Sequence, residues 1–156
     1  SELLIVPERN FAIVTLSNAG PNGIPFNQAV VRWALEEYLG AVDRDPEPIP
    51  YRETRAQEII GVYEIEAQII TIRTDGEKMT LAAGIKPEIR AAADSEMPPD
   101  YPPADFGLLP GNGDEYIITS GGLQGQRGFF TRDENGSVIG LDIGGRLYKR
   151  ISRTPT

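Results

Sequence analysis

Apolar residues follow two different patterns along this chain, one in residues 1–40 and another from about residue 58 onward. The first part opens with two continuous apolar runs, 3–6 and 11–16, separated by four residues that begin at Pro7. A connection this short cannot form a parallel crossover, so the two runs predict an antiparallel hairpin. Neither run alternates between apolar and polar residues, which is typical of strands that are covered on both faces.

A helical pattern follows the hairpin over residues 26–40 and ends at Gly40, a common stop signal. The predicted apolar face contains Phe26, Val30, Val31, Trp33, Ala34, Leu35, Tyr38 and Leu39. We interpret Trp33 as the residue that anchors this helix in the core. One helix covers only one face of a hairpin. We therefore expect residues 1–40 to be a remnant of a larger sheet whose packing partner lies upstream, or to be buried in an oligomer.

Residues 41–57 separate the two patterns. Prolines and charged residues alternate there, as in Asp45-Pro46-Glu47-Pro48, which favours an extended linker and a domain boundary. From 58 to 152 the apolar period changes to two, beginning with Tyr63 and Ile65, and short runs are separated by turns rich in Gly, Asp and Asn. The pattern predicts a closed antiparallel barrel or a sandwich, because closure removes exposed strand edges.

Within this second part, a meander is expected around the turn at Asp75-Gly76, and a further short strand at 85–89. Residues 91–105 are rich in proline and cannot form regular structure, so we interpret them as a long surface loop or a lid. Strands are then predicted at 106–109, 115–120, 126–132, 137–143 and 146–150. The hairpin turn at Asp133-Glu134-Asn135-Gly136 is the clearest single sign of antiparallel pairing.

Composition narrows the functions that the chain can have. Its 15 Lys and Arg residues against 23 Asp and Glu residues give a formal net charge of -8, which repels nucleic acid and anionic lipid. The chain has no Cys and no His, so disulfides, thiolate metal sites and the commonest general base are excluded. No stretch approaches the roughly 20 apolar residues that span a bilayer. We therefore expect no nucleic-acid partner and no membrane span.

No complete catalytic or metal-binding motif is present. Ser120 lacks the glycine two positions before it and Ser137 lacks the glycine two positions after it in the G-x-S-x-G pattern, and no Ser is followed three positions later by Lys. Glu64 with Glu66 could form an acid–base or calcium pair, but a solvated strand face is the better interpretation. The glycine-rich segment 121–128 lacks the ending of a phosphate-binding loop and is interpreted as a turn. We assign no catalytic, cofactor-binding or metal-binding residue.

Residues 1–18, SELLIVPERNFAIVTLSN, resemble the final strand pair of beta-lactamase-related serine hydrolases, the superfamily of penicillin-binding proteins and class C beta-lactamases. In that family an apolar strand, a Pro-containing turn and a second apolar strand ending in Thr or Ser and Asn precede a C-terminal helix, which residues 26–40 match. The family's catalytic motifs S-x-x-K, Y-x-N and His/Lys-Ser/Thr-Gly all precede this segment. No catalytic residue therefore carries over to this chain.

The second part of the chain resembles the lipocalin-like C-terminal barrel that many such hydrolases carry. The resemblance rests on three segments: 60–63, 129–138 and 146–150. The expected fold is therefore mainly β. An antiparallel up-and-down β-barrel at 58–152 is preceded by the linker 41–57 and, at 1–40, by a β-hairpin plus one α-helix left over from an α/β hydrolase domain.

The resemblance implies a non-catalytic C-terminal accessory portion of a serine hydrolase. Its partner would be the upstream hydrolase domain of the same polypeptide, and its barrel would serve assembly or control access to the active site. Two alternatives stay open. One is a barrel that binds a small apolar ligand beneath the loop 97–103, with Tyr63, Tyr116, Phe129, Phe130 and Tyr148 lining or filling its interior. The other is an oligomerisation module that forms a homo-oligomer through the exposed hairpin.

Overall fold

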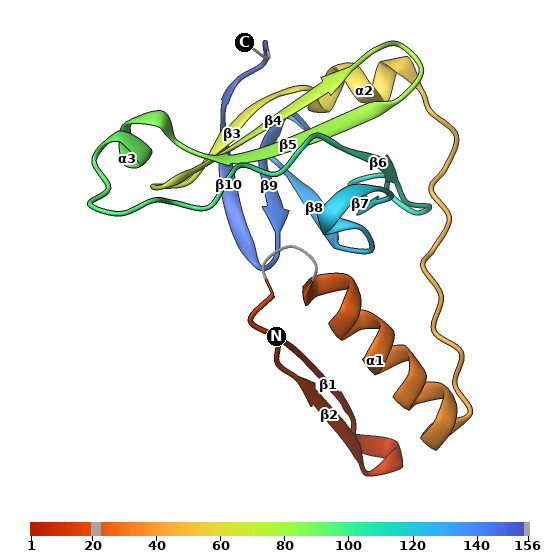
Figure 1. The fold of residues 1–156 in the computed structure, drawn as a ribbon. Coiled ribbons are helices and arrows are strands. Elements are labelled where there is room, and N and C mark those ends of the chain that lie inside the picture. The colour runs from red at the N-terminus through yellow and green to blue at the C-terminus, as the bar shows by residue number, and fades with distance from the viewer. Residues whose placement is uncertain (20–22, 155–156) are drawn as a thin grey trace.

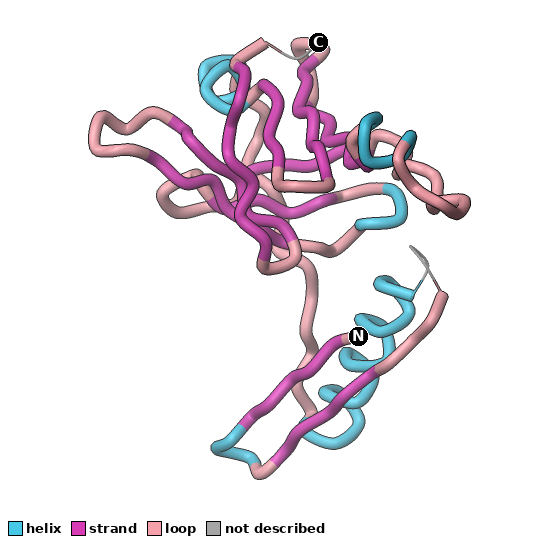
Figure 2. The backbone as a smooth tube through the Cα atoms, turned by 90° about the vertical axis from the view of Figure 1, so that its left-hand side faces the viewer, coloured by secondary structure: helices cyan, strands magenta, loops and turns pink. Residues whose placement is uncertain are grey.

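The computed structural model describes residues 1–19 and 23–154 of the 156-residue chain. It contains a two-stranded sheet with one long helix, and a closed barrel of eight antiparallel strands (Figure 1). In the view of Figure 2 the hairpin and its helix lie below the barrel and are joined to it by an extended segment. The mainly β class, the hairpin and the closed antiparallel barrel expected from the sequence are confirmed.

The hairpin consists of β1 (Glu2–Val6), the 3-10 turn η1 (Pro7–Arg9) and β2 (Phe11–Thr15). Leu3 lies opposite Val14, and Ile5 lies opposite Ala12. These four residues point away from the helix and are exposed, whereas the alternate residues are half-buried or buried. The strands are therefore covered on one face only, although the sequence has apolar residues on both.

The helix α1 (Gly23–Leu39) lies along the hairpin and ends at Gly40, whose φ of 64° suits a residue without a side chain. Its buried residues are Gly23, Asn27, Val31 and Ala34. Trp33 is 57% exposed, so its predicted role as a core anchor is wrong. Phe26 and Tyr38 are also exposed, although the Tyr38 ring lies 6.2 Å from the ring of Phe11 in β2.

The barrel closes in the order β10, β3, β4, β5, β6, β7, β8, β9, and every described neighbouring pair is antiparallel. Its strands are β3 (Gly61–Glu64), β4 (Gln68–Thr74), β5 (Met79–Ile85), β6 (Ala104–Leu108), β7 (Glu115–Ile118), β8 (Arg127–Arg132), β9 (Val138–Ile143) and β10 (Arg146–Ser152), with the 3-10 turn η2 (Gly121–Leu123) between β7 and β8. The order follows the chain, so only β10 with β3 joins distant segments. This is the up-and-down topology that the resemblance to lipocalin-like barrels implied, and the closed barrel is one of the two folds that the strand spacing predicted.

Two short helices, α2 (Glu53–Ile59) and α3 (Pro87–Ala91), occur where no helix was predicted. The helix α2 overlaps the end of the predicted linker, and residues 41–52 before it have no regular structure. The helix α3 replaces most of the strand expected at 85–89. Pro87 explains the second difference, because proline has no N–H for a strand ladder and suits the first turn of a helix.

The barrel core is built from the inward side chains of the strands. Tyr63 and Tyr116 are fully buried, Phe130 and Tyr148 are nearly so, and Phe129 faces outward. The helix α2 closes one end of the barrel with Ala56 and Ile59, both at 0% exposure. Four of the five aromatic residues considered in the sequence therefore belong to the interior, and Phe129 does not.

Hydrogen bonds fix α2 in this position. The Tyr63 hydroxyl donates to the Ile59 carbonyl at 2.6 Å, and the Arg150 guanidinium donates to the Glu58 carbonyl at 2.8 Å. Arg150 also donates to the carbonyl of Ile60 and lies over the Tyr63 ring, with its guanidinium carbon 5.7 Å from the ring centre. A cation at the last turn of a helix is favourable, because the free carbonyls there carry partial negative charge.

A cavity at the open end of the barrel

The end of the barrel opposite α2 contains a cavity of about 670 Å³. Inward side chains of several strands form its walls, and the Pro-rich loop forms part of its rim. The lining residues are Ile24, Gln68, Ile69, Ile70, Ala83, Gly84, Ile85, Pro98, Pro99, Asp100, Tyr101, Pro102, Leu123, Gln126, Ile143, Gly144, Arg146 and Tyr148. A concave, mostly apolar cavity of this size with a few polar groups is typical of a site for a small molecule.

The loop at 92–103 covers a gap between two strands. β5 pairs with β6 only through Met79 to Leu81, so the second half of β5 has no strand partner on that side. The loop takes this place: the Tyr101 N–H donates to the Ala83 carbonyl at 3.1 Å, and the Asp100 carboxylate accepts from the Ile85 N–H at 3.0 Å. The long loop expected from the prolines is confirmed, and it borders the cavity.

Asp100 fastens the loop further. Its carboxylate forms an ion pair with Arg90 of α3 at 2.5 Å, and Arg90 also donates to the Pro98 carbonyl at 3.0 Å. The pKa of Asp100 is lowered, first by the hydrogen bond from the Ile85 N–H and then by Arg90. A side chain at Gly84 would place its Cβ 2.7 Å from the Asp100 carboxyl carbon. The absence of a side chain at Gly84 therefore allows the loop to lie against β5.

Polar groups are few inside the cavity. The hydroxyl of Tyr148 on β10 donates to Oε1 of Gln68 on β4 at 2.5 Å. The strand β3 lies between these two strands in the barrel. Arg146 lies two residues before Tyr148 on β10 and is exposed at the rim. Burial raises the pKa of Tyr148, and the nearby Arg146 cation offsets part of that rise.

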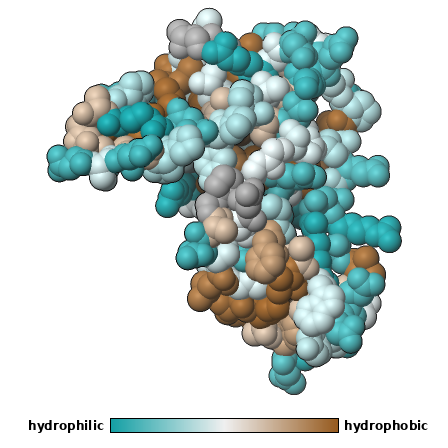
Figure 3. Space-filling model, viewed as in Figure 1, coloured by the Kyte–Doolittle hydropathy of each residue, from teal (hydrophilic) through white to brown (hydrophobic). Residues whose placement is uncertain are grey.

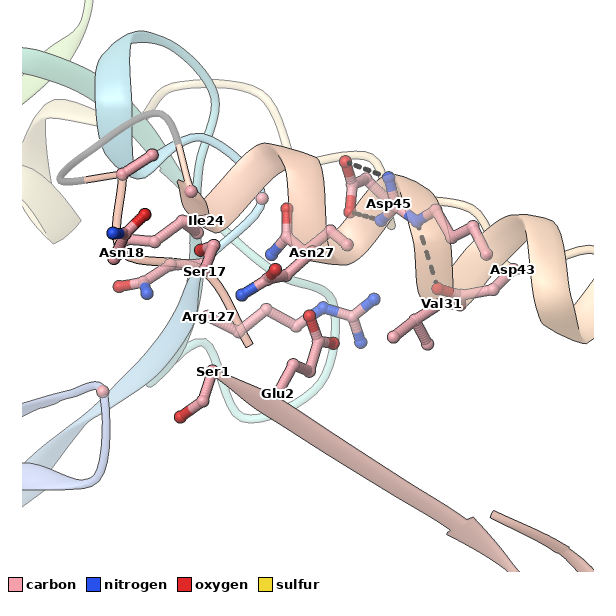
Figure 4. Close-up of a pocket in the computed structure, with 17 residues that line it drawn as sticks. Ser1, Glu2, Ser17, Asn18, Ile24, Asn27, Val31, Asp43, Asp45 and Arg127 are labelled. Carbon is pink, nitrogen blue, oxygen red and sulfur yellow. Dashed lines mark hydrogen bonds and ion pairs between the residues drawn. The ribbon is translucent and has the colours of Figure 1, made fainter. Parts of the chain in front are cut away.

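The hairpin of β1 and β2 together with α1 is called the hairpin–helix part below. A second cavity, of about 650 Å³, lies between it and the barrel. Figure 4 shows Asn27 of α1 and Arg127 of β8 in this cleft, with Glu2 at the start of β1. The Asn27 side chain is buried, and its Oδ1 atom has no hydrogen-bond partner. Arg32, also in the cleft, pairs with Asp43 at 3.2 Å and with Asp45. The cleft is polar, and most of its charged groups are already compensated.

The two cavities are neighbours, because Ile24, Gln126 and Gly144 line both of them. The mouth of the barrel cavity therefore lies beside the cleft and faces the hairpin–helix part.

The acidic residues considered in the sequence do not gather into a site, whereas the glycine-rich segment 121–128 contains the turn η2 and contributes Leu123 and Gln126 to the cavity wall. Glu64 pairs with Lys86 at 2.8 Å, and Glu66 is exposed beyond the end of β3. Asp133 closes the hairpin turn by accepting the N–H groups of Asn135 and Ser137, each at 2.9 Å. Within residues 1–19 and 23–154, no three acidic side chains gather where they could hold a metal ion. In the same residues, no helix is long and apolar enough to cross a bilayer.

The sequence pointed to one residue of the cavity wall, Tyr148, and to the loop on its rim. It did not single out Gln68, Leu123 or Arg146. A usable signal was present for Arg146 and Tyr148, since residues two apart on a strand point to the same face. Which face of each strand lies inward is fixed by the barrel as a whole, so Gln68 could not be assigned from its own strand.

No protein-family model matches this chain, and no curated protein matches it. Among solved structures, one of SurE is 19% identical with a TM-score of 0.47, over 83% of this chain and 27% of that chain. A structure of SurE with D-Leu is 20% identical with a TM-score of 0.44, over 81% of this chain and 27% of that chain. This chain thus spans little more than a quarter of the length of those structures. Similarity at this level carries no argument about its function.

Proposed function

We propose that this chain is the non-catalytic C-terminal accessory portion of a beta-lactamase-related serine hydrolase. The supporting observation is the hairpin–helix part, which exposes apolar side chains on both sides. Leu3, Ile5 and Val14 are each about 60% exposed on the outer hairpin face. The resemblance of residues 1–18 to the final strand pair of that family supplies the covering element, namely the rest of the hydrolase sheet and its helices.

In this arrangement the barrel would sit beside the hydrolase domain. The cleft that contains Asn27 and Arg127 separates the two parts of the chain, and the barrel cavity lies beside that cleft. A barrel in this place restricts the directions from which a substrate reaches the hydrolase domain. The proposed role is therefore control of access or of assembly, with the catalytic residues supplied by the upstream domain.

The test is the coding sequence that adjoins the Ser1 codon. We expect it to encode S-x-x-K, Y-x-N and His/Lys-Ser/Thr-Gly in that order. The protein that includes them should cleave a chromogenic ester or beta-lactam, and the chain of 156 residues should cleave neither. Hydrolysis by the 156-residue chain alone, or the absence of these three motifs from the adjoining sequence, would contradict the proposal.

The cavity favours a second function, the binding of a small apolar molecule by the barrel. Its walls are mainly aliphatic, and Ala83 in the second half of β5 is one of the lining residues. Saturable binding of a nonionic fluorescent probe tests this function. We expect Ala83→Phe to abolish binding by filling the cavity, and Ala82→Phe, on the outer face of the same strand, to leave it unchanged. A probe that shows no saturation with the unaltered chain contradicts this function.

A further inference from the structure

We propose that the ligand of the barrel cavity carries a carboxylate at one end of an apolar body, and that Arg146 and Gln68 bind this carboxylate at the cavity mouth. The inference rests on the second function proposed above, that the barrel binds an apolar molecule. It adds the chemical class of the ligand and the direction in which it lies.

The direction follows from where the polar groups lie along the strands. Arg146 is the first residue of β10 and Gln68 is the first residue of β4, so both stand at the end of the barrel opposite α2. Farther in, the cavity meets Ile70 and the barrel core, which is closed by the fully buried Ile59. A ligand with one polar end would therefore place that end at the mouth and its apolar body toward the core.

The type of polar group follows from the hydrogen-bond donors present. The Tyr148 hydroxyl proton is used on Oε1 of Gln68, which leaves the amide Nε2 of Gln68 as the unused end of that side chain. Arg146 also forms a hydrogen bond with the Tyr148 hydroxyl, but within residues 1–19 and 23–154 no ion pair joins it to a carboxylate, and no acceptor is bound to Nε2 of Gln68. A guanidinium and an amide N–H are both donors, and a carboxylate accepts from two donors at once.

The charges near the mouth agree with an anionic ligand. Asp100 is the one carboxylate that lines the cavity, and its charge is already balanced by Arg90 and by the Ile85 N–H. Arg146 therefore remains as the uncompensated charge of the lining. The chain as a whole has a net charge of -8 and repels anions, so attraction of a carboxylate has to come from a local cation such as this one.

Competition at pH 8 between a nonionic fluorescent probe and three ligands with the same chain length tests the inference: dodecanoate, dodecanol and dodecylammonium. We expect dodecanoate to bind roughly tenfold more tightly than dodecanol, as one charge-assisted hydrogen-bonded contact allows, and dodecylammonium to bind least. Arg146→Gln should remove the preference for dodecanoate and leave the affinity for dodecanol unchanged. Lys149→Gln removes the same charge from the outer face of β10 and serves as the matched control.

The outcomes separate the two proposals. Saturable binding of the probe with equal affinities for dodecanoate and dodecanol would overturn the carboxylate inference and leave the apolar site in place. An unchanged preference in Arg146→Gln would also overturn it. If the probe itself does not saturate, both the binding function and the inference are wrong. Gln68→Leu, which keeps the charge of Arg146, should weaken dodecanoate alone, and by less than Arg146→Gln.

Discussion

The barrel and the hairpin–helix part use apolar residues in opposite ways. In the barrel, strand residues such as Ile70, Ile72 and Leu141 are at most 1% exposed, and the strands close in a ring in which the loop 92–103 bonds the part of β5 that β6 does not reach. In the hairpin–helix part, residues of the same kind remain in contact with solvent on the outer hairpin face and on the aromatic side of α1. Figure 3 shows apolar surface gathered over this lower part of the molecule.

The barrel buries its apolar residues and pairs its strand edges within itself, whereas the hairpin–helix part does not. A closed sheet pairs all its strands and buries one face of each, so it needs no further partner. A two-stranded hairpin with one helix has two open edges and one open face, and an isolated hairpin is marginally stable. The hairpin–helix part therefore has the surface of an element made to pack against something else, which the barrel does not.

The largest effect is expected from a cavity in the barrel core. Leu141 is 0% exposed, so Leu141→Ala should lower the free energy of unfolding by about 2–5 kcal/mol in a denaturant titration. The matched substitution in the other region, Leu3→Ala, should change it by less than about 0.5 kcal/mol. Equal losses from the two substitutions would mean that the outer hairpin face is buried in solution, as the barrel core is.

A smaller effect is expected from close packing inside the barrel wall. A Cβ at Gly128 would lie 2.1 Å from the Asp142 carbonyl oxygen and 2.5 Å from the Tyr116 hydroxyl, so Gly128→Ala should cost about 1–3 kcal/mol. Tyr116→Phe removes only the hydrogen bond from Tyr116 to Asp142, at 2.7 Å, and should cost about 0.5–1.5 kcal/mol. If Gly128→Ala costs less than Tyr116→Phe, the close approach of β8 to β9 is not required.

A third prediction concerns the ion pairs that hold α2 against the barrel. Arg132 donates to the Asp114 carboxylate at 2.9 Å and pairs with Glu58 of α2 at 2.8 Å, while Arg55 of α2 reaches Asp114 at 3.2 Å. The hydrogen bond from Arg132 is the main reason why the pKa of Asp114 is lowered. Because the folded pKa lies below the unfolded value of about 4, Asp114 stabilises the barrel above that value. This contribution is lost as the pH falls through the lower, folded pKa.

Stability measured against pH checks this prediction. Asp114→Asn should be less stable than the unaltered chain at pH 7, by about 1–3 kcal/mol, and the two should converge in strong acid. Asp43→Asn breaks the ion pair with Arg32 in the hairpin–helix part, where the Asp43 side chain is 46% exposed, and should leave barrel unfolding unchanged. A constant difference between Asp114→Asn and the unaltered chain at every pH would show that charge is not the cause.

The fold was predictable from the sequence where the pattern was local. Alternation identified the strands of the barrel, and the turn at 133–136 identified the hairpin between β8 and β9. The helix α2 was not predicted, since seven residues are too few for a helical period to show and only Ala56 and Ile59 are buried in it. The predicted apolar face of α1 was correct for the buried Val31 and Ala34, but its aromatic residues Phe26, Trp33 and Tyr38 are exposed. An apolar pattern that extends around a helix does not state which side meets the hairpin.

The cavity was predictable only in outline. Prolines identified the loop on its rim, and Tyr148 belonged to the aromatic residues expected inside the barrel. Gln68 and Arg146 are polar residues at strand ends, where alternation is weakest. Their side chains face the cavity because of the register between β10, β3 and β4, and a shift of one residue would turn them to solvent.

The smallest effect on stability and the largest on association are expected at the outer hairpin face. Leu3 and Val14 are cross-strand neighbours, so Leu3→Lys combined with Val14→Glu places opposite charges side by side and keeps the hairpin paired. The free energy of barrel unfolding should change by less than about 0.5 kcal/mol.

In light scattering, we expect the unaltered chain to self-associate and this variant to be monomeric, because an apolar face without its partner is covered by a second copy. Leu147→Lys, on the outside of the barrel, should not change the association. If the unaltered chain is monomeric in dilute solution, the outer hairpin face does not bind a second copy and this prediction is wrong.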